Sequence, residues 1–212
     1  MLYLLTGEVQ IGKTRWLHSL IAELEAQGAI CEGVIAPGIW KENADGTFDK
    51  LGITNEMLPQ HKTVTFALRD DIAKARGVFD ETSQAANAQM MWHIFDDSIV
   101  MVNSHFADLI THKHHVLEGN NCEGAAPEGC NPRRILIVDE LGRLELMRGG
   151  GLTEAMKLLA EGPDDYYSDA IVIARDALGL PEEVEHLFGK TWDTFMRISP
   201  SDEAKDAILS RL

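Results

Sequence analysis

The sequence is poor in basic residues. It contains 19 lysine and arginine residues against 34 aspartate and glutamate residues, which gives a formal net charge of −15 at pH 7. Proteins that hold nucleic acid neutralise its phosphate backbone with a basic surface, and this chain as a whole would repel such a partner. We therefore expect no nucleic-acid partner, and any polyanion that binds must find a local basic pocket.

Cysteines and long apolar runs are also scarce. The three cysteines, Cys31, Cys122 and Cys130, form no even disulfide framework, so a reducing compartment, the cytoplasm, is expected. No apolar stretch approaches the roughly 20 residues of a membrane-spanning helix. The first apolar run, residues 2–5, has no basic segment before it. The sequence therefore predicts neither a secreted nor a membrane protein.

The composition excludes disorder and does not support two full domains. Hydrophobic residues make up 45% of the chain and charged residues 25%, which is typical of soluble globular proteins. Single cores usually stop growing only above roughly 250 residues, so we expect one domain over residues 1–212.

Apolar periodicity predicts alternating strands and helices. Residues 2–5 are typical of a strand buried on both faces, and a helical stripe from Lys13 ends near Gly28. Further strands are expected at 31–36, 135–138, 170–174 and 194–198, and further helices at 152–161, at 181–188 and from Ser201.

A hairpin region, at about 38–68, interrupts this alternation. Asp45-Gly46 lies between two segments of mixed polarity, and Asp-Gly is a strong hairpin signal. Trp40 lies on this hairpin, where it can stack on a nucleotide base or pack within the hairpin itself. The sequence leaves both roles open.

Residues 85–111 have helical spacing and contain no proline or glycine, so we expect one or two packed helices there. Met90, Met91, Trp92 and Phe95 are interpreted either as an exposed surface for a protein partner or as core residues. Helical spacing favours the core.

A loop insertion is expected at about 113–134. Residue types that bind metals gather around it, namely His112, His114, His115, Cys122 and Cys130. The two cysteines are too far apart for the short Cys-x₂₋₄-Cys pairing of structural zinc sites, and no second pair follows. A polar, solvated loop is therefore favoured over a metal site.

Residues 7–14 read Gly-Glu-Val-Gln-Ile-Gly-Lys-Thr, which matches the phosphate-binding pattern G-x-x-x-x-G-K-[ST] between a strand and a helix. The glycines let backbone N–H groups point into one concavity at the positive end of the helix. Lys13 is expected to reach the β- and γ-phosphates and the Thr14 hydroxyl to bind Mg²⁺. The expected nucleotide-binding residues are Gly7, Glu8, Val9, Gln10, Ile11, Gly12, Lys13, Thr14 and Arg15.

A second acidic motif follows the apolar run 135–138. Asp139 is expected to bind Mg²⁺, and Glu140 to orient and deprotonate an attacking water. Phosphoryl transfer spreads negative charge, so a nearby arginine is expected, and Arg143 and Arg175 are the candidates. Either arginine could instead pair with a surface carboxylate. The predicted catalytic residues are therefore Glu140, Lys13, Arg143 and Arg175.

Together, the phosphate loop, Gly-Val-Ile-Ala-Pro at 33–37 and Val-Asp-Glu-Leu-Gly-Arg-Leu-Glu-Leu at 138–146 resemble the small P-loop nucleoside-triphosphatase family that includes the cancer-related nucleoside-triphosphatase. The second motif of that family typically reads Asp-Glu-Ile-Gly-Lys-Met-Glu. Leu141 and Leu144 are conservative replacements, and Arg143 stands where the family usually has lysine.

This resemblance implies an α/β fold of the RecA-like P-loop type, with three layers, a mainly parallel sheet and a β-hairpin insertion. It also implies hydrolysis of ATP, GTP or a similar nucleoside triphosphate to the diphosphate and phosphate with Mg²⁺. Two alternatives stay open: a nucleotide-dependent switch or assembly factor, whose protein partner would bind residues 85–111, and a small-molecule P-loop kinase.

Overall fold

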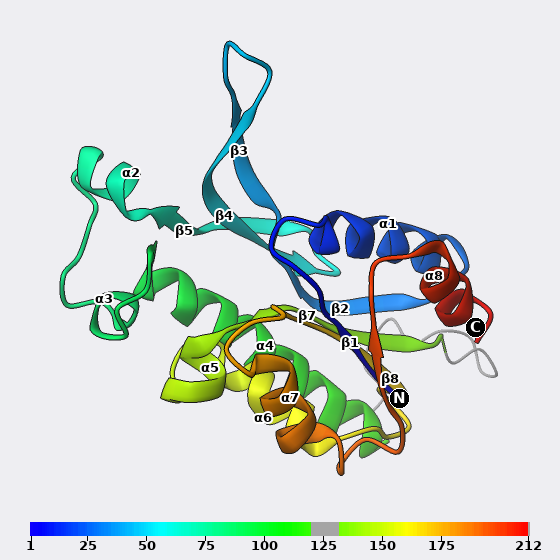
Figure 1. Cartoon of the computed structure of the whole chain (residues 1–212). Helices are drawn as coiled ribbons and strands as arrows, with labels where there is room; N and C mark the ends of the chain where they lie inside the picture. The colour runs from blue at the N-terminus through cyan, green and yellow to red at the C-terminus, as the bar shows by residue number, and fades with distance from the viewer. Residues whose placement is uncertain (120–131, 212) are drawn as a thin grey trace.

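The computed structural model describes residues 1–119 and 132–211, which form a mixed sheet between two layers of helices (Figure 1). Its strands are β1 (Leu2–Leu5), β2 (Ile30–Ile35), β3 (Gly38–Glu42), β4 (Phe48–Leu58), β5 (Lys62–Arg69), β6 (Trp92–Ile94), β7 (Arg134–Leu141), β8 (Asp169–Ala174) and β9 (Phe195–Ile198). Its helices are α1 (Lys13–Ala26), α2 (Asp70–Ala75), α3 (Gln84–Asn87), α4 (Asp96–Leu117), α5 (Arg143–Arg148), α6 (Thr153–Glu161), α7 (Leu180–Phe188) and α8 (Asp202–Leu209).

The centre of the sheet is parallel. The strands follow the order β6-β5-β4-β2-β7-β8-β1-β9, and the neighbours from β2 to β9 pair in parallel. Every residue of β1 and β8 is buried, as expected for strands that are apolar on both faces. The predicted α/β fold with a mainly parallel sheet is confirmed.

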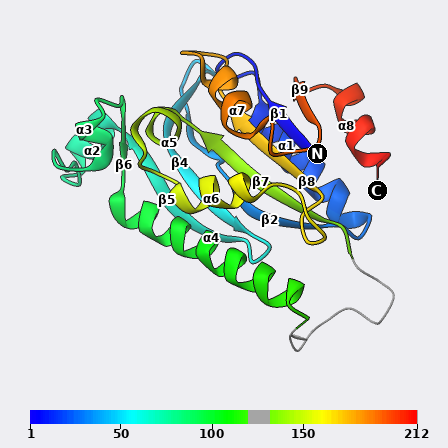
Figure 2. The same cartoon turned by 90° about the horizontal axis from the view of Figure 1, so that it is seen from below.

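Helices cover both faces of this parallel part. On one face, buried residues of α1 and α8 pack against alternate residues of the central strands. On the other face, α4, α6 and α7 enclose a second core, and α4 runs across β2, β4 and β5 (Figure 2). Because β1, β8 and β7 run parallel, their carboxyl ends meet at one edge of the sheet. Ligands of open α/β sheets bind at such an edge.

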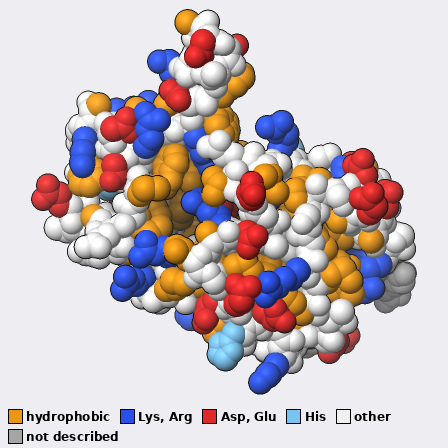
Figure 3. Space-filling view, viewed as in Figure 1, with side chains coloured by type: hydrophobic (Ala, Val, Ile, Leu, Met, Phe, Trp, Pro, Cys, Tyr) orange, Lys and Arg blue, Asp and Glu red, His pale blue; other side chains and the backbone are white. Residues whose placement is uncertain are grey.

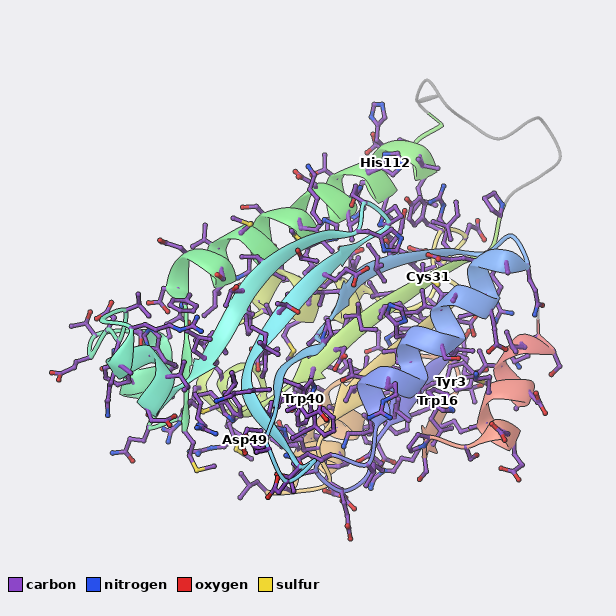
Figure 4. The ribbon with its side chains drawn as sticks, turned by 90° about the horizontal axis from the view of Figure 1, so that it is seen from above. Tyr3, Trp16, Cys31, Trp40, Asp49 and His112 are labelled. Atoms are coloured by element: carbon purple, nitrogen blue, oxygen red, sulfur yellow. The ribbon has the colours of Figure 1, made fainter. Side chains whose placement is uncertain are left out.

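Beyond β2 the sheet becomes antiparallel, through β4, β5 and β6. The predicted hairpin is confirmed: β3 pairs with β4, and the turn contains Gly46 at φ +81°. Its tip projects from the body of the molecule (Figure 1). Figure 4 labels Trp40 and Asp49 on its two strands.

The prediction of one or two packed helices over 85–111 is confirmed for the second half and is wrong in its first half. Between residues 85 and 91 only α3 is helical, and β6 then pairs antiparallel with β5, with His93 opposite Leu68. The free edge of β5 outweighs the helical spacing, because strand pairing satisfies backbone groups that would otherwise stay exposed. The Phe95 N–H donates a hydrogen bond to the Phe66 carbonyl, at 3.0 Å, and helix α4 begins at the next residue.

The expected loop at 113–134 is shorter at both ends, because α4 continues to Leu117 and β7 begins at Arg134. Lys113 is buried on α4 and forms ion pairs with Glu161 and Asp164. Cys122 and Cys130 lie outside the described residues, as does most of this predicted insertion. No helix within the described ranges is long and apolar enough to cross a membrane.

Gly33 allows β2 to lie close to β7. Its φ is +124°, and a Cβ atom added there would lie 2.0 Å from the Ile137 carbonyl oxygen. The Gly33 carbonyl in turn accepts a hydrogen bond from His105 Nε2 on α4, at 3.0 Å. This glycine therefore fixes the position of the strand that leads to the edge of the site.

We expect Gly33→Ala to lower the free energy of unfolding by about 3 kcal/mol, because strained backbone and a backbone clash combine. Gly28→Ala is the matched control, since Gly28 has φ +90° but open space around its Cβ position. The control should lose only about 1–2 kcal/mol. Urea denaturation measures both values, and equal losses would contradict the role given to the close approach.

Candidate active site

The phosphate-binding pattern forms a loop between β1 and α1, as predicted. Gly7 and Gly12 have φ of +143° and +95°, a backbone region that side chains disfavour. Gly12 is the last residue before α1, so the amides of the first helical turn point toward the loop. The backbone is thus shaped as an anion-binding site.

Lys13 is folded over this loop. It is only 8% exposed, and its Nζ donates to the carbonyl oxygens of Gly7 and Glu8, both at 2.8 Å. Burial lowers the pKa of Lys13, whereas the charge of nearby Glu140 raises it. The ammonium group therefore donates its hydrogen bonds to neutral carbonyl oxygens. An anion in the loop could replace these carbonyls as the acceptor.

Of the predicted nucleotide-binding residues 8–11 and Arg15, Val9 alone lines the pocket described below. The side chains of residues 8–11 are exposed. Arg15 is exposed on α1 and does not line the pocket described below. Its side chain therefore does not face the pocket, and a part in nucleotide binding is left to its backbone N–H in the first helical turn.

Asp139 lies buried near the end of β7. Its Oδ2 accepts a hydrogen bond from the Ala36 N–H at 3.0 Å, and among the described residues its Oδ1 has no hydrogen-bond partner. Burial raises the pKa of Asp139 to about 7, although the Ala36 N–H and the Thr14 hydroxyl lower it. A carboxylate oxygen is therefore left without a partner beside a hydroxyl at the edge of the phosphate loop.

The residues present at this point fit Mg²⁺. Thr14 and Asp139 line the same pocket and offer the oxygen ligands that Mg²⁺ prefers. Within the described ranges, no group of three or more histidine, cysteine, aspartate or glutamate residues gathers to hold a metal. A Mg²⁺ ion at Thr14 and Asp139 would therefore take its remaining ligands from water and phosphate oxygens, as this ion commonly does.

Two predicted catalytic residues contact each other. Glu140 on β7 and Arg175, which follows the adjacent strand β8, form an ion pair through Oε1 and Nε. Arg143 begins α5 and lines the same pocket, and it forms no ion pair with any described residue. Both arginines thus lie beside the acidic motif. Arg175 does pair with a carboxylate, as the alternative reading expected, but this carboxylate is Glu140 of the motif.

These residues line one end of a pocket of about 250 Å³. Its polar end is formed by Thr14, Asp139, Glu140, Arg143 and Arg175. Its far end is formed mainly by apolar residues of β4, β5 and β6, including Ile53, Phe66, Trp92 and Ile94. Figure 3 shows a hollow lined by hydrophobic side chains below the hairpin, with basic side chains at its margin.

Sequence reasoning missed this second half of the pocket. Lys50 and Asn55 on β4 line it, and so does Met90. Trp92, interpreted as core, also lines it, and Met91 beside it is exposed. Residue 92 joins the sheet only because β6 pairs with β5, where it lies opposite Arg69, so no local spacing could reveal the site.

Lys50 lies close to two tryptophan rings, those of Trp40 and Trp92. Its Nζ lies 5.6 Å from the centre of the Trp92 ring and 6.0 Å from that of Trp40. Burial lowers the pKa of Lys50, and the charge of Glu140 raises it. Trp40 itself does not line the pocket, so packing within the hairpin describes it better than stacking on a ligand there.

Comparison with known proteins gives matches among solved structures alone: no protein-family profile and no curated protein matches the sequence. A human cancer-related nucleoside triphosphatase is 14% identical, with a TM-score of 0.52 over 99% of this chain and 93% of that chain. THEP1 from the hyperthermophile Aquifex aeolicus is 17% identical, with a TM-score of 0.51 over 100% of this chain and 96% of that chain. These matches confirm the predicted resemblance at the level of the fold.

We expect the buried carboxyl of Asp139 to make the metal-free protein more stable in mild acid. The pKa of about 7 in the folded state lies above the ordinary value of 3.8, so the folded state binds the proton more tightly and stability rises as pH falls through 7. Between about pH 7.5 and 5.5 the gain is about 2 kcal/mol.

Urea denaturation in the presence of a metal chelator measures this gain. Asp139→Asn is the control, because it keeps the shape of the side chain but cannot ionise. Subtracting its pH dependence removes the general effect of the acidic surface. A pH dependence equal in the two proteins would show that Asp139 ionises normally in the folded state.

Proposed function

We propose that this protein is a Mg²⁺-dependent nucleoside triphosphatase, which hydrolyses ATP, GTP or a similar triphosphate to the diphosphate and phosphate. The observation that carries the proposal is the buried Asp139 carboxylate, whose Oδ1 lacks a partner among the described residues. It lies beside Thr14 of the phosphate loop and is followed by Glu140 at the mouth of the same pocket.

Local donors bind the triphosphate in this proposal. The chain carries a net charge of −15, so its overall field opposes a polyanion. The loop amides, the first turn of α1 and the Lys13 ammonium group supply the attraction instead. On binding, Lys13 exchanges the carbonyls of Gly7 and Glu8 for phosphate oxygens.

Hydrolysis uses the acidic motif and the two arginines. Mg²⁺, held at Thr14 and Asp139, would neutralise charge that develops on the phosphates. Glu140 orients a water and takes its proton as the water oxygen attacks the γ-phosphorus and the bond to the diphosphate breaks. Arg175 holds the Glu140 carboxylate in place, and Arg143 faces the negative charge of the transition state.

Glu140→Gln should lower the kcat of phosphate release from ATP by at least about 100-fold, because the amide cannot accept the proton of the water. Affinity for ADP should stay within a factor of about two, since Glu140 does not touch the phosphate loop's donors. Glu203→Gln, at an exposed position of α8, is the matched control and should leave kcat unchanged. Equal rates for wild type and Glu140→Gln would rule out Glu140 as the base.

Lys13→Ala should weaken ATP binding by about 10- to 100-fold, because a charge-assisted hydrogen bond to phosphate is lost. Chelation of Mg²⁺ should weaken binding further, since the triphosphate then keeps its full charge. Lys190→Ala removes an exposed lysine and serves as the control. Equilibrium dialysis gives the affinities, and near-normal binding by Lys13→Ala without Mg²⁺ would contradict the role given to local donors.

A further inference from the structure

Lys50 is the basic residue that the hairpin brings to the pocket. It lies on β4, opposite Trp40 of β3, which Figure 4 labels. Because β4 runs antiparallel to β2 and pairs with it only from Glu56 onward, Lys50 lies beyond the carboxyl end of β2. The phosphate loop and Asp139 lie at this same edge of the sheet, and Lys50 lines one pocket with Thr14 and Asp139. The antiparallel part of the sheet thus carries a cation toward the phosphate end of the site.

The Lys50 ammonium group has no anionic partner. Its Nζ forms no ion pair and donates no hydrogen bond within residues 1–119 and 132–211. The Glu140 carboxylate pairs with Arg175 instead. A half-buried charge without a partner destabilises a fold, even in a chain with 34 acidic residues. The Lys50 Nζ is not sealed from solvent, in contrast to the Oδ1 of Asn55 on the same strand, so an anion from solution can reach it.

Two tryptophan rings fix where this ammonium group lies. Its Nζ is 5.6 Å from the centre of the Trp92 ring and 6.0 Å from that of Trp40. A cation at this distance is attracted by the electrons of the ring face, but its N–H groups stay available for a stronger acceptor. Gly38 leaves room for the lysine chain, since a Cβ atom added there would lie 3.0 Å from the Lys50 Cε. Lys50 is therefore held in one direction with its hydrogen-bond donors unused.

Lys50 and Lys13 have the same charged neighbours. Burial lowers the pKa of both lysines, whereas the charges of Glu140 and Asp139 raise it and that of Arg175 lowers it. Burial in turn raises the pKa of Asp139, and the charge of Lys50 is one of the effects that lower it. Lys13 begins α1 and Lys50 belongs to β4. The two lysines thus reach one group of charges from two different elements.

We propose that Lys50 is a catalytic residue that binds the γ-phosphate of the nucleotide. The proposal rests on the proposed function, in which the γ-phosphorus is attacked by the water that Glu140 holds. The γ-phosphate then lies beside Glu140, within the group of charges that surrounds Lys50. Its oxygens supply the anion that the Lys50 ammonium group lacks in the free protein.

This contact has two consequences for the reaction. The Lys50 Nζ donates hydrogen bonds to the γ-phosphate oxygens, and its charge opposes the negative charge on the group being transferred. The lysine keeps its proton throughout, since Glu140 takes the proton of the water. A diphosphate has no phosphate group at this position, so Lys50 also selects the triphosphate over the diphosphate.

Lys50→Gln removes the charge and keeps a polar side chain. It should lower the kcat of phosphate release from MgATP by about 10- to 100-fold, because a charged donor to the transferred group is lost. Titration calorimetry with adenylyl imidodiphosphate, a non-hydrolysable ATP analogue, should show binding weakened at least about tenfold, with affinity for MgADP within a factor of about two. Lys50→Arg keeps the charge and should restore the preference for the analogue to within about threefold of wild type.

Lys41→Gln is the matched control. Lys41 is an exposed lysine of β3 in the same hairpin and does not line the pocket, so its variant should behave as wild type does. Equal losses of affinity for the analogue and for MgADP in Lys50→Gln would show that Lys50 supports the shape of the site without touching the γ-phosphate. That result, or an unchanged kcat with an unchanged preference, overturns the proposal.

Acetylation of the wild-type protein tests the same contact if Lys50→Gln does not fold. Acetic anhydride modifies accessible amines, and mass spectrometry gives the rate at each lysine. The magnesium complex of the analogue should slow acetylation of Lys50 at least about fivefold and MgADP less than about twofold, while Lys41 reacts equally throughout. Equal protection of Lys50 by both nucleotides, or none, overturns the proposal and leaves the proposed triphosphatase intact. A wild-type protein that binds neither nucleotide would instead contradict the proposed function, and this proposal with it.

Discussion

The buried carboxylate of Asp139 is the constraint on which the site depends. It is carried by β7, it accepts a hydrogen bond from the Ala36 N–H after β2, and it lies beside Thr14 at the start of α1. Three elements far apart in the sequence therefore converge on one side chain. Because burial raises its pKa, the apo fold is less stable at neutral pH than it would be with a neutral group there. Ionisable groups with strongly shifted pKa values of this kind cluster at functional sites.

The sheet has two parts with different tasks. Its parallel part runs from β2 to β9, is buried on both faces from β2 to β1, and holds the phosphate loop, the acidic motif and Arg175 at one edge. Its antiparallel part, from β4 to β6, has an exposed hairpin and supplies the wall of a pocket. The parallel part carries the residues of the two sequence motifs, and the antiparallel part carries the apolar residues beside them. Lys50 and Asn55 belong to the second part, although Glu140 of the first part influences the pKa of Lys50.

The phosphate end of the site could be predicted because its signals are local. Lys13 and Thr14 follow a glycine-rich loop, and Asp139 and Glu140 follow an apolar run, so each pair is placed by its own strand. The apolar end could not be predicted, because it arises from pairing between segments far apart in sequence. Trp92 has helical spacing with its neighbours, yet it lies in β6, whose place is set by the free edge of β5. The ion pair of Glu140 with Arg175 likewise depends on which strand lies beside β7.

β8 is the single strand between β1 and β7, and its width sets the distance between them. Adjacent strands lie about 4.8 Å apart, so placing β8 between them separates the ends of β1 and β7 by roughly 10 Å. The phosphate loop follows β1 on one side of that interval, and Arg175 follows β8 in its middle. If β1 and β7 were direct neighbours, the interval would halve and no third strand could deliver a guanidinium group between them. Strand order, rather than loop sequence, therefore sets the spacing between the basic and acidic groups at this edge of the sheet.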